Sequence, residues 1–305
     1  VSMMLSRGCP FKCTFCDAPI TMGTKLRFWS MDRIISDIKM YKEKYGVTNF
    51  VFKDSTFTAK KKWALEFCQR LIDEKLDIKW RCNTRANLVP PGLLDLMAQA
   101  GCYVINFGVE SGHPEILKRI KKEVDLDDVR DAFERCRKLG IRTYATFLMG
   151  NPGETDETAQ ATLDFALSIR PSLAMFFVST AYPGTPMYDE GVADGSCEPR
   201  WWAKQEFDAA KNSAFQVRWG WTDAGALKFT DFDPEAWQRK ATRAFYLRPR
   251  FVWDTFTFTL MNPYFIRHIW NLGTEMLRFY KLRTLPPSRA PPSGRRGPLL
   301  PGFAA

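Results

Sequence analysis

The fold is decided by the stretch from Arg142 to Ser179, which reads RTYATFLMGNPGETDETAQATLDFALSIRPSLAMFFVS. A β-rich run, Arg142–Met149, is followed by a turn rich in glycine and proline. Apolar residues with helical spacing then begin near Thr155, and a second β-rich run occupies Leu173–Ser179. Two strands joined by a helix in this way lie parallel, with a right-handed crossover between them.

The same alternation of strand and helix runs through the body of the chain. Four more β-rich runs precede this stretch: Ser2–Ser6, Asn49–Lys53, Lys79–Thr84 and Tyr103–Val109. Segments with helical spacing separate them, the first of which has Ser30 as its N-cap. Six such units predict an α/β fold, either a partial (β/α)6 barrel of the TIM type or a doubly wound sheet. Both place their chemistry at the carboxyl ends of the strands.

Composition excludes several classes of protein. Of the 305 residues, 45% are apolar and 26% are charged, which is ordinary for a globular protein and excludes a disordered or collagen-like chain. No apolar run approaches the roughly 18 residues of a membrane span. The eight cysteines are spaced too irregularly for a disulfide scaffold, and no secretory signal opens the chain. We therefore expect a protein of the reducing cytoplasm.

The pattern divides the chain into four parts. We predict a barrel core over residues 1–190 and a loop-rich connection over residues 191–233. A basic, aromatic helical extension is predicted over residues 234–285, and a disordered tail rich in Pro, Gly and Arg over residues 286–305. The net charge of +10 resides in the end of the chain, since residues 239–305 hold 12 basic and two acidic side chains.

Three cysteines follow the first strand, in the run Arg7-Gly8-Cys9-Pro10-Phe11-Lys12-Cys13-Thr14-Phe15-Cys16. Thiolates this close on one loop can converge on a small metal centre. An iron–sulfur cube usually takes four cysteines, so a loop that gives three leaves one iron open for catalysis. Zinc is the alternative, but its structural sites need four ligands, and the other five cysteines are isolated in the sequence.

The spacing of Cys9, Cys13, Phe15 and Cys16 resembles the signature of the radical S-adenosylmethionine (SAM) superfamily. The resemblance covers residues 2–188. It implies a partial (β/α)6 barrel and a [4Fe–4S] cluster on the three cysteines, with SAM chelating the fourth iron. It also implies that SAM is cleaved reductively to a 5′-deoxyadenosyl radical, which abstracts hydrogen from a substrate. A reducing partner such as flavodoxin or ferredoxin would supply the electron.

Polar residues stand at the ends of the predicted strands, where that family binds SAM. The resemblance places Asp54 by the amino group of SAM, and Glu110 or Ser111 by its ribose or carboxylate. Arg85 is the candidate for the carboxylate, because its donor fork suits that group. Gly108 and Phe15 complete the predicted cofactor-binding set. Purely structural roles are the alternative, since Asp54 could cap a helix and Gly108 could serve only a close backbone approach.

Further motifs resemble the branch of the family that carries a cobalamin domain before the barrel. They are SRGCP at residues 6–10, GVESG at residues 108–112, GNPGET at residues 150–155 and YPGTP at residues 182–186. The branch includes methyltransferases, the anaerobic cyclase of bacteriochlorophyll synthesis and hopanoid-tailoring enzymes. We expect the cobalamin domain to be missing upstream, and a hydrophobic or polycyclic small-molecule substrate for methyl transfer or oxidative cyclisation. The alternatives are a cobalamin-independent oxidoreductase or rearrangement enzyme, and a non-catalytic metal-binding module.

The segment 239–283 interleaves basic residues with large aromatic ones. Such a face suits an anionic membrane surface, which would place the protein peripherally at the inner membrane face. Docking of the same face on the barrel or on the missing domain is the alternative. Nucleic acid ranks last, because the arginines are mixed with apolar residues and do not form a polar strip.

Overall fold

The computed structural model describes residues 1–204, 227–249, 251 and 253. By its internal contacts the chain divides into two compact units, Val1–Phe251 and Val252–Ala305. All the helices and strands named below belong to the first unit. The predicted tail over residues 286–305, and all of the extension after Trp253, lie outside the described residues.

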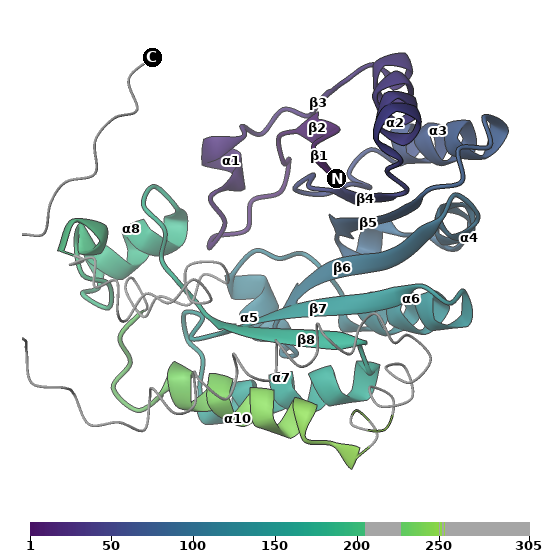
Figure 1. Cartoon of the computed structure of the whole chain (residues 1–305). Helices are drawn as coiled ribbons and strands as arrows, with labels where there is room; N and C mark the ends of the chain where they lie inside the picture. Colours follow the sequence, from purple (N-terminus) through teal and green to yellow (C-terminus); the bar gives the residue numbers. More distant parts are fainter. Residues whose placement is uncertain (205–226, 250, 252, 254–305) are drawn as a thin grey trace, which may run out of the picture. The chain divides into compact units, whose positions relative to one another are not determined.

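A parallel sheet of six strands forms the centre of the first unit, in the order β1-β4-β5-β6-β7-β8 (Figure 1). Its strands are β1 (Ser2–Met3), β4 (Asn49–Phe52), β5 (Lys79–Thr84), β6 (Cys102–Glu110), β7 (Arg142–Met149) and β8 (Leu173–Val178). The order follows the chain without reversal, whereas a doubly wound sheet reverses at a switch point. The predicted α/β class and partial (β/α)6 barrel are therefore confirmed.

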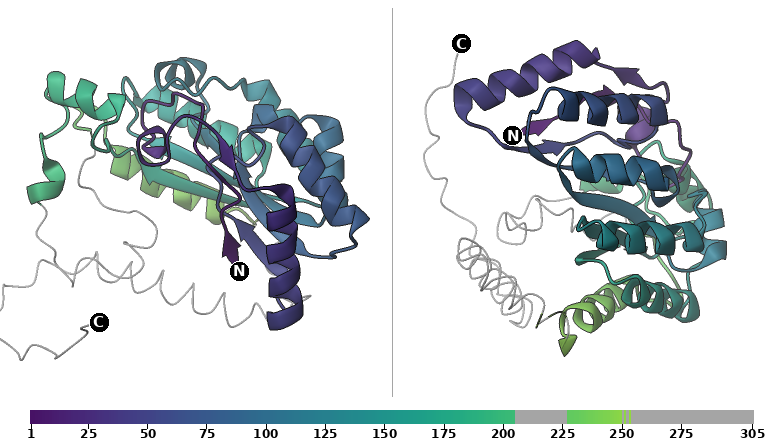
Figure 2. Two further views of the ribbon diagram at one scale, coloured as in Figure 1. Left: turned by 90° about the horizontal axis from the view of Figure 1, so that it is seen from above. Right: turned by 90° about the vertical axis from the view of Figure 1, so that its right-hand side faces the viewer.

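Helices follow the strands and lie along one face of the sheet, as the views in Figure 2 show. They are α2 (Met31–Tyr45), α3 (Lys61–Asp73), α4 (Pro91–Gln99), α6 (Leu126–Lys138) and α7 (Asp156–Ile169). Shorter elements are α1 (Ala18–Thr21), α5 (Pro114–Arg119), α8 (Pro186–Ala193) and two 3₁₀ turns at Ala86–Leu88 and Trp201–Lys204. Apolar side chains of the long helices pack on the strands and make one continuous core.

The strands explain how that core forms. Alternate residues of β7 are buried and half-buried along its whole length, because successive side chains point to opposite faces. The face toward the helices is closed by large aromatic side chains. Phe52, Phe57, Phe67 and Trp80 stand 5.2–5.9 Å apart between ring centroids. Each such pair adds about 0.5–1.5 kcal/mol beyond the area it buries.

The first predicted strand, Ser2–Ser6, is two strands. Only Ser2 and Met3 pair with β4, while β2 (Ser6–Arg7) pairs antiparallel with β3 (Arg27–Phe28) in a separate ribbon. The N–H of Trp29 donates to the carbonyl of Leu5 and extends this ribbon. The chain thus leaves the large sheet directly before the cysteines, and the ribbon holds both ends of the cysteine-bearing loop.

The predicted C-terminal helical part begins with α10 (Pro234–Tyr246), which packs beside β8 and α7 (Figure 1). The side-chain amide of Gln238 donates to the carbonyl of Phe176, and the hydroxyl of Tyr246 donates to that of Ala174. Trp237 donates from its indole N–H to Asp156 at the start of α7. The bonds from Gln238 and Tyr246 satisfy carbonyls of β8, the last strand of the sheet.

The predicted boundaries at residues 190, 233 and 285 stay predictions, although α8 continues through residue 193. Within the described part of the chain, no helix is both long enough and apolar enough to span a bilayer.

Candidate functional site

The loop that bears the three cysteines is anchored at its start by Gly8. This residue has φ of +102°, and a Cβ there would lie 2.3 Å from the carbonyl oxygen of Lys25. The next residue, Cys9, donates its N–H to the carbonyl of Gly23 at 3.0 Å. A side chain at position 8 would therefore force the two halves of the loop apart, which gives this glycine a structural reason.

Two further backbone bonds fix the middle of the loop. The N–H of Thr14 donates to the carbonyl of Ile120, which follows α5, and the carbonyl of Thr14 accepts from Met187 of α8. The short helices α5 and α8 lack a long periodic stripe and were not predicted. Both hold the loop in place against the barrel.

Each of the three sulfurs lies near a polar group. The sulfur of Cys9 is 3.9 Å from the hydroxyl of Thr56, and that of Cys16 accepts from the N–H of Ala18 at 3.5 Å. The sulfur of Cys13 accepts from Nη1 of Arg85 at 3.4 Å. Burial raises the pKa of the Cys13 thiol, and it raises that of Cys16 to about 11. Deprotonation by an incoming metal therefore has to overcome desolvation.

The arrangement of these thiols can be tested against the cofactor that the sequence implies. Among the described residues, no three histidine, cysteine or carboxylate side chains converge closely enough to hold one metal ion. A single ion needs that convergence, whereas each cysteine of an iron–sulfur cube binds a different iron. Three thiols on one anchored loop, with donors aimed at two of the sulfurs, fit a cube held at three corners.

The remaining cysteines behave differently, and the structure gathers four of them. Cys68 of α3, Cys82 of β5, Cys102 of β6 and Cys136 of α6 are all buried in the core. Burial raises the pKa of Cys68, Cys102 and Cys136, and that of Cys136 reaches about 12. Cys68, Cys102 and Cys136 therefore stay protonated at neutral pH, and all four core cysteines pack as small apolar side chains.

Asp54, two residues after β4, lies beside the start of the cysteine loop. It is fully buried, and its Oδ1 accepts from both the N–H and the hydroxyl of Ser6. Its Oδ2 is buried without a hydrogen-bond partner in the described part of the chain. Burial raises the pKa of this carboxyl although the bonds from Ser6 oppose the shift. One acceptor oxygen of this carboxyl thus stays unsatisfied within the described residues.

Glu110, at the end of β6, forms a buried ion pair that the sequence did not predict. Its Oε1 accepts from Nζ of Lys122 at 2.8 Å, and its backbone has φ of +71°. A Cβ at Gly108 would stand 2.4 Å from that same carboxylate oxygen and 2.8 Å from Nζ. The absence of a side chain at Gly108 thus makes room for the pair. Lys122 also lies 6.0 Å from the ring centroid of Phe15.

Ser111 and Gly112 meet helix α7. The hydroxyl of Ser111 shares a hydrogen bond with that of Thr162 and accepts from the N–H of His113. A Cβ at Gly112 would come within 2.8 Å of the backbone of Ala161 and Thr162. The hydroxyl of Ser111 already makes two bonds, so a ligand would have to compete for it. Its predicted contact with SAM stays a prediction.

Glu154 occupies a second buried polar cluster after β7. Its Oε2 accepts from the N–H groups of Gly150 and Asn151, and its Oε1 has no partner among the described residues. Burial raises the pKa of this carboxyl to about 7. Thr155 is the N-cap of α7, and Glu154 closes the turn directly before it.

The structure therefore brings some predicted residues together and keeps others apart. Asp54 lies against Ser6 before the loop, Arg85 against Cys13, and Glu110 with Lys122 near Phe15. These contacts join the loop to residues that follow β4, β5 and β6. Arg85 is in hydrogen-bond contact with the loop and with the carbonyl of Glu123, and its predicted bond to the SAM carboxylate stays a prediction.

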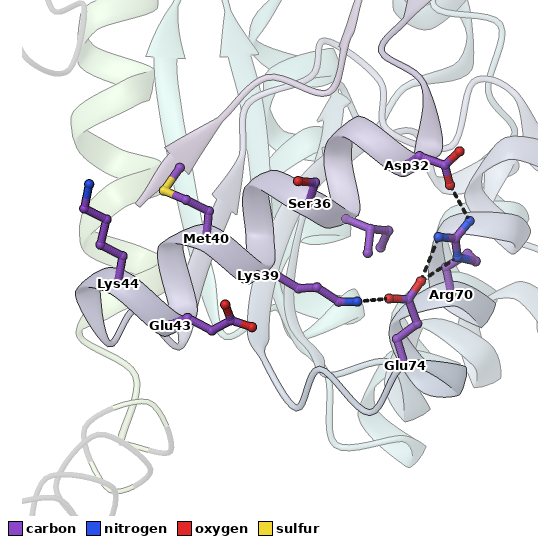
Figure 3. A pocket seen from close by; sticks show the side chains of 9 residues that line it. Asp32, Ser36, Lys39, Met40, Glu43, Lys44, Arg70 and Glu74 are labelled. Carbon is purple, nitrogen blue, oxygen red and sulfur yellow. Dashed lines mark hydrogen bonds and ion pairs between the residues drawn. The ribbon is translucent and has the colours of Figure 1, made fainter.

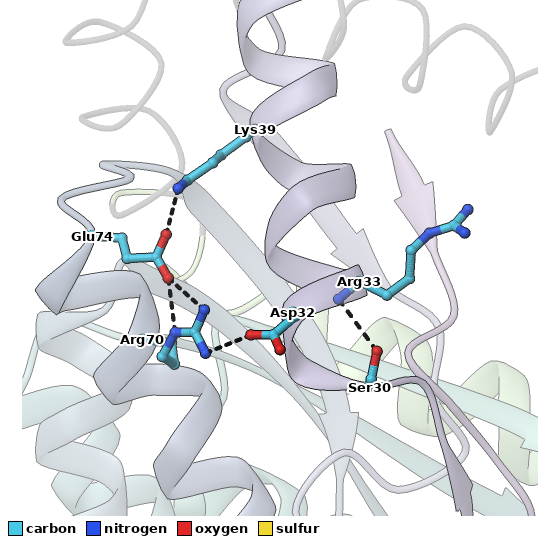
Figure 4. Close-up of polar contacts among 6 residues, drawn as sticks. All are labelled: Ser30, Asp32, Arg33, Lys39, Arg70 and Glu74. Atoms are coloured by element: carbon cyan, nitrogen blue, oxygen red, sulfur yellow. Dashed lines mark hydrogen bonds and ion pairs between the residues drawn. The ribbon is translucent and has the colours of Figure 1, made fainter.

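A groove on the outside of the barrel lies between α2 and α3 (Figure 3). It has a volume of about 490 Å³, and none of the predicted site residues lines it. Arg70 bridges Asp32 and Glu74, and Lys39 pairs with Glu74 at 2.6 Å (Figure 4). The hydrogen bonds from Lys39 and Arg70 hold the pKa of the Glu74 carboxyl below its ordinary value. Asp32 is exposed and the other three are half-buried, and all four charges are already paired.

Comparison with known proteins gives a consistent picture. The family model of the Radical SAM superfamily matches residues 3–166, more than half of the 305 residues. The uncharacterized methyltransferase PH0819 of Pyrococcus horikoshii is 32% identical over 81% of the chain. The anaerobic magnesium-protoporphyrin IX monomethyl ester cyclase of Cereibacter sphaeroides is 30% identical over 61% of it. The chain spans 51% and 31% of the lengths of these two relatives.

One solved structure supports the fold. It is the radical SAM methyltransferase TsrM of Kitasatospora setae, with cobalamin and a [4Fe–4S] cluster bound. It superimposes with a TM-score of 0.64 at 19% identity, over 82% of this chain and 52% of TsrM.

Proposed function

The chain belongs to the radical SAM superfamily, and from this membership we propose that it is the barrel of an enzyme that activates a hydrophobic small molecule by hydrogen abstraction. SAM and a [4Fe–4S] cluster are the cofactors of the family. When bound, they supply a 5′-deoxyadenosyl radical after one-electron reduction. The protein's own residues hold these groups, orient them and exclude water.

We infer that Cys9, Cys13 and Cys16 bind three irons of the cluster. The observation that carries this proposal is the position of their loop, which is held between the ribbon, α5 and α8. The loop contacts Arg85, directly after β5, and Thr56, four residues after β4. The carboxyl ends of such strands are where barrels of this type carry their chemistry. Two of the thiols are buried, so the loop also limits contact of the cluster with solvent.

We assign the SAM-binding side to Asp54, Gly108, Glu110 and Ser111, with Phe15 beside them. The unpartnered Oδ2 of Asp54 suits an ammonium group, because a buried acceptor without a partner is costly until it is filled. The buried pair of Glu110 with Lys122 offers both an acceptor and a donor for a ligand that carries hydroxyl and carboxylate groups.

We further propose that the chain comes from a cobalamin-dependent parent. Its relatives include an anaerobic cyclase and a methyltransferase, and TsrM binds cobalamin. Methyl transfer or oxidative cyclisation on a hydrophobic substrate is the reaction class this favours. A low-potential electron donor such as flavodoxin or ferredoxin would be its partner. The basic segment 239–283, most of which lies outside the described residues, would contact an anionic membrane surface from the cytoplasmic side.

Anaerobic reconstitution with iron and sulfide tests the cluster. We expect about four irons per chain and a brown chromophore that the triple variant Cys9→Ala, Cys13→Ala, Cys16→Ala does not acquire. Addition of SAM and a low-potential reductant should then release methionine and 5′-deoxyadenosine. A colourless, zinc-loaded protein that leaves SAM intact would refute the proposed function.

The same assay with added methylcobalamin separates the two reaction classes. Methyl transfer converts SAM to S-adenosylhomocysteine, which hydrogen abstraction alone does not form. Liposomes that contain anionic lipid, floated with the full chain and with a version ending at residue 253, which keeps α10 on the barrel, test the membrane contact. Equal binding of the two proteins would contradict that contact.

A further inference from the structure

Arg85 is a buried cation that has no carboxylate partner among the residues that the structure describes. Only 4% of it is exposed, and it follows β5 directly. Its hydrogen-bond partners in the described part of the chain are the sulfur of Cys13, 3.4 Å from Nη1, and the carbonyl of Glu123, 3.2 Å from Nη2. Its Nε has no partner among the described residues. Removing a guanidinium from water is costly unless a negative charge compensates it.

Lys122, a second buried cation near Cys13, differs from Arg85 because it has a carboxylate partner. Lys122 is equally buried, but the carboxylate of Glu110 lies 2.8 Å from its ammonium and neutralises it. Lys122, Glu110 and Arg85 all act electrostatically on Cys13. Because the first two charges cancel, Arg85 leaves this side of the loop with one uncompensated positive charge.

The position of that charge is fixed from three directions. The guanidinium carbon lies 4.0 Å from the ring centroid of Phe11, so the group stacks on an aromatic side chain of the cysteine loop. Nη2 is held by the backbone after α5, and Nη1 is directed at the sulfur. A planar donor fork held on a stack is better oriented than a flexible ammonium would be.

We propose that Arg85 is a positioning residue for the cluster, which donates an N–H···S hydrogen bond to the iron-bound thiolate of Cys13 and raises the reduction potential of the cluster. This inference rests on the proposed function, because it requires Cys13 to be a cluster ligand. The negative charge missing around Arg85 is then the thiolate together with the anionic cluster. The sequence-based role at the SAM carboxylate concerns a different group and does not require this bond.

The redox step needs one electron and no bond cleavage. A [4Fe–4S]²⁺ centre takes one electron from a low-potential donor of the flavodoxin or ferredoxin class and becomes [4Fe–4S]⁺. The added charge is negative, so a nearby fixed positive charge stabilises the reduced form more than the oxidised form. A hydrogen bond to the ligand sulfur acts in the same direction, because it withdraws electron density from the thiolate.

The test is a redox titration of the reconstituted full chain without SAM, with titanium(III) citrate as reductant and the EPR signal of the reduced cluster as readout. Omitting SAM removes any role of Arg85 at its carboxylate. The variants are Arg85→Lys, which keeps the charge, Arg85→Gln, which keeps a donor, and Arg85→Met, which keeps neither. Arg81→Gln is the matched control, since it removes a half-buried arginine four residues earlier on β5, about 13 Å along the strand.

We expect Arg85→Met to lower the ratio of reduced to oxidised cluster at a fixed potential at least tenfold, which is about 59 mV for one electron. Arg85→Gln should fall between Arg85→Met and the unaltered protein. Arg85→Lys should restore most of the ratio, and Arg81→Gln should change it less than twofold.

Two results would overturn the inference. One is an Arg85→Met protein that holds a full complement of iron and titrates within twofold of the unaltered chain. The other is an equal shift for Arg81→Gln, which would show a general effect of charge. If Arg85→Met fails to fold, the comparison of Arg85→Lys with Arg85→Gln decides, since only the inference predicts that Arg85→Lys titrates above Arg85→Gln. Failure of the proposed function looks different, because then the unaltered chain acquires no cluster.

Discussion

Two groups of cysteines in this protein have very different surroundings, although two of the three loop thiols are buried like the core ones and only Cys16 is half-buried. Cys9 and Cys13 of the loop are 8% and 9% exposed, while the four core thiols, from Cys68 to Cys136, are between 0% and 4% exposed. The core thiols lie among apolar side chains and one another. The loop thiols lie against a hydroxyl, a guanidinium and a backbone N–H. Partners for a thiolate, more than burial, therefore distinguish a candidate ligand from a packing residue.

The same contrast extends to the charged residues. At the ends of the strands, Asp54, Arg85 and Glu154 each retain a buried polar atom without a partner among the described residues. On the outer helices, Asp32 is exposed, Lys39 and Arg70 are half-buried, and all three are paired. Unsatisfied buried groups are costly and rare, and these three lie after the carboxyl ends of strands, which supports a site there; Trp63 on α3 and Asn106 within β6 carry such atoms elsewhere.

The largest effect that tests this contrast is the loss of the cluster. Cys13→Ala should lower bound iron from about four per chain to less than one after reconstitution, because the loop then offers only two thiolates. Cys68→Ala removes a thiol from the core and should leave iron content unchanged. Iron and acid-labile sulfide analysis measures both. Equal iron loss in the two variants would show that the loop cysteines do not differ from the core cysteines as iron ligands.

A buried ion pair at the strand ends gives the next effect. Lys122→Met leaves the carboxylate of Glu110 buried without its partner, which should lower the free energy of unfolding by about 3–5 kcal/mol. The double variant Lys122→Met, Glu110→Leu replaces both charges and should recover much of that loss. Urea unfolding of the protein before cluster loading measures these differences. A loss below about 1 kcal/mol for Lys122→Met would mean that the pair is effectively solvated.

The contribution of Glu154 to the stability of the protein should depend on pH. Its pKa is raised to about 7 from an ordinary value of 4.5, so the folded state binds the proton more tightly than the unfolded state does. The resulting stabilisation is complete below pH 4.5 and is lost as pH rises toward 7. It amounts to about 3 kcal/mol. Glu154→Gln cannot titrate and should flatten this part of the stability curve, as measured by urea unfolding between pH 5 and pH 8.

Failure of the two curves to diverge would place the carboxyl of Glu154 in contact with water. Asp156→Asn, two residues later at the start of α7, serves as the control for a change of charge.

The smallest effect belongs to the core. Cys68→Ser places a hydroxyl where the thiol lies in apolar surroundings, and should cost about 1–3 kcal/mol of stability. Iron content should not change. Thermal unfolding and iron analysis of the same sample test both points. A serine variant as stable as the unaltered chain would show that water or a polar group reaches this part of the core.

Much of this architecture could be predicted from the sequence. The strands β5 and β7 occupy the predicted residues, and glycines with positive φ, Gly140 and Gly150, bound β7 on both sides. The split of the first strand could not be predicted, since it depends on pairing with residues 27 and 28. The cysteine spacing identified the loop, because this signal is local.

The surroundings of the loop could not be predicted in the same way. Lys122 meets Glu110 only because the chain after α5 returns to the end of β6, and no local pattern marks that return. The position of Arg85 was predicted at the end of a strand, but its contact with Cys13 joins residues 72 positions apart. Such contacts depend on tertiary structure, which hydrophobic periodicity does not encode.

The central claim is that three loop cysteines leave one corner of the cluster open for SAM. The most direct measurement is the EPR spectrum of the reduced, reconstituted protein before and after addition of SAM. If SAM binds the open iron, the g-values of the cluster should change. In Asp54→Asn, a higher SAM concentration should be needed to produce the same change. A reduced cluster whose spectrum is identical with and without saturating SAM would contradict the claim.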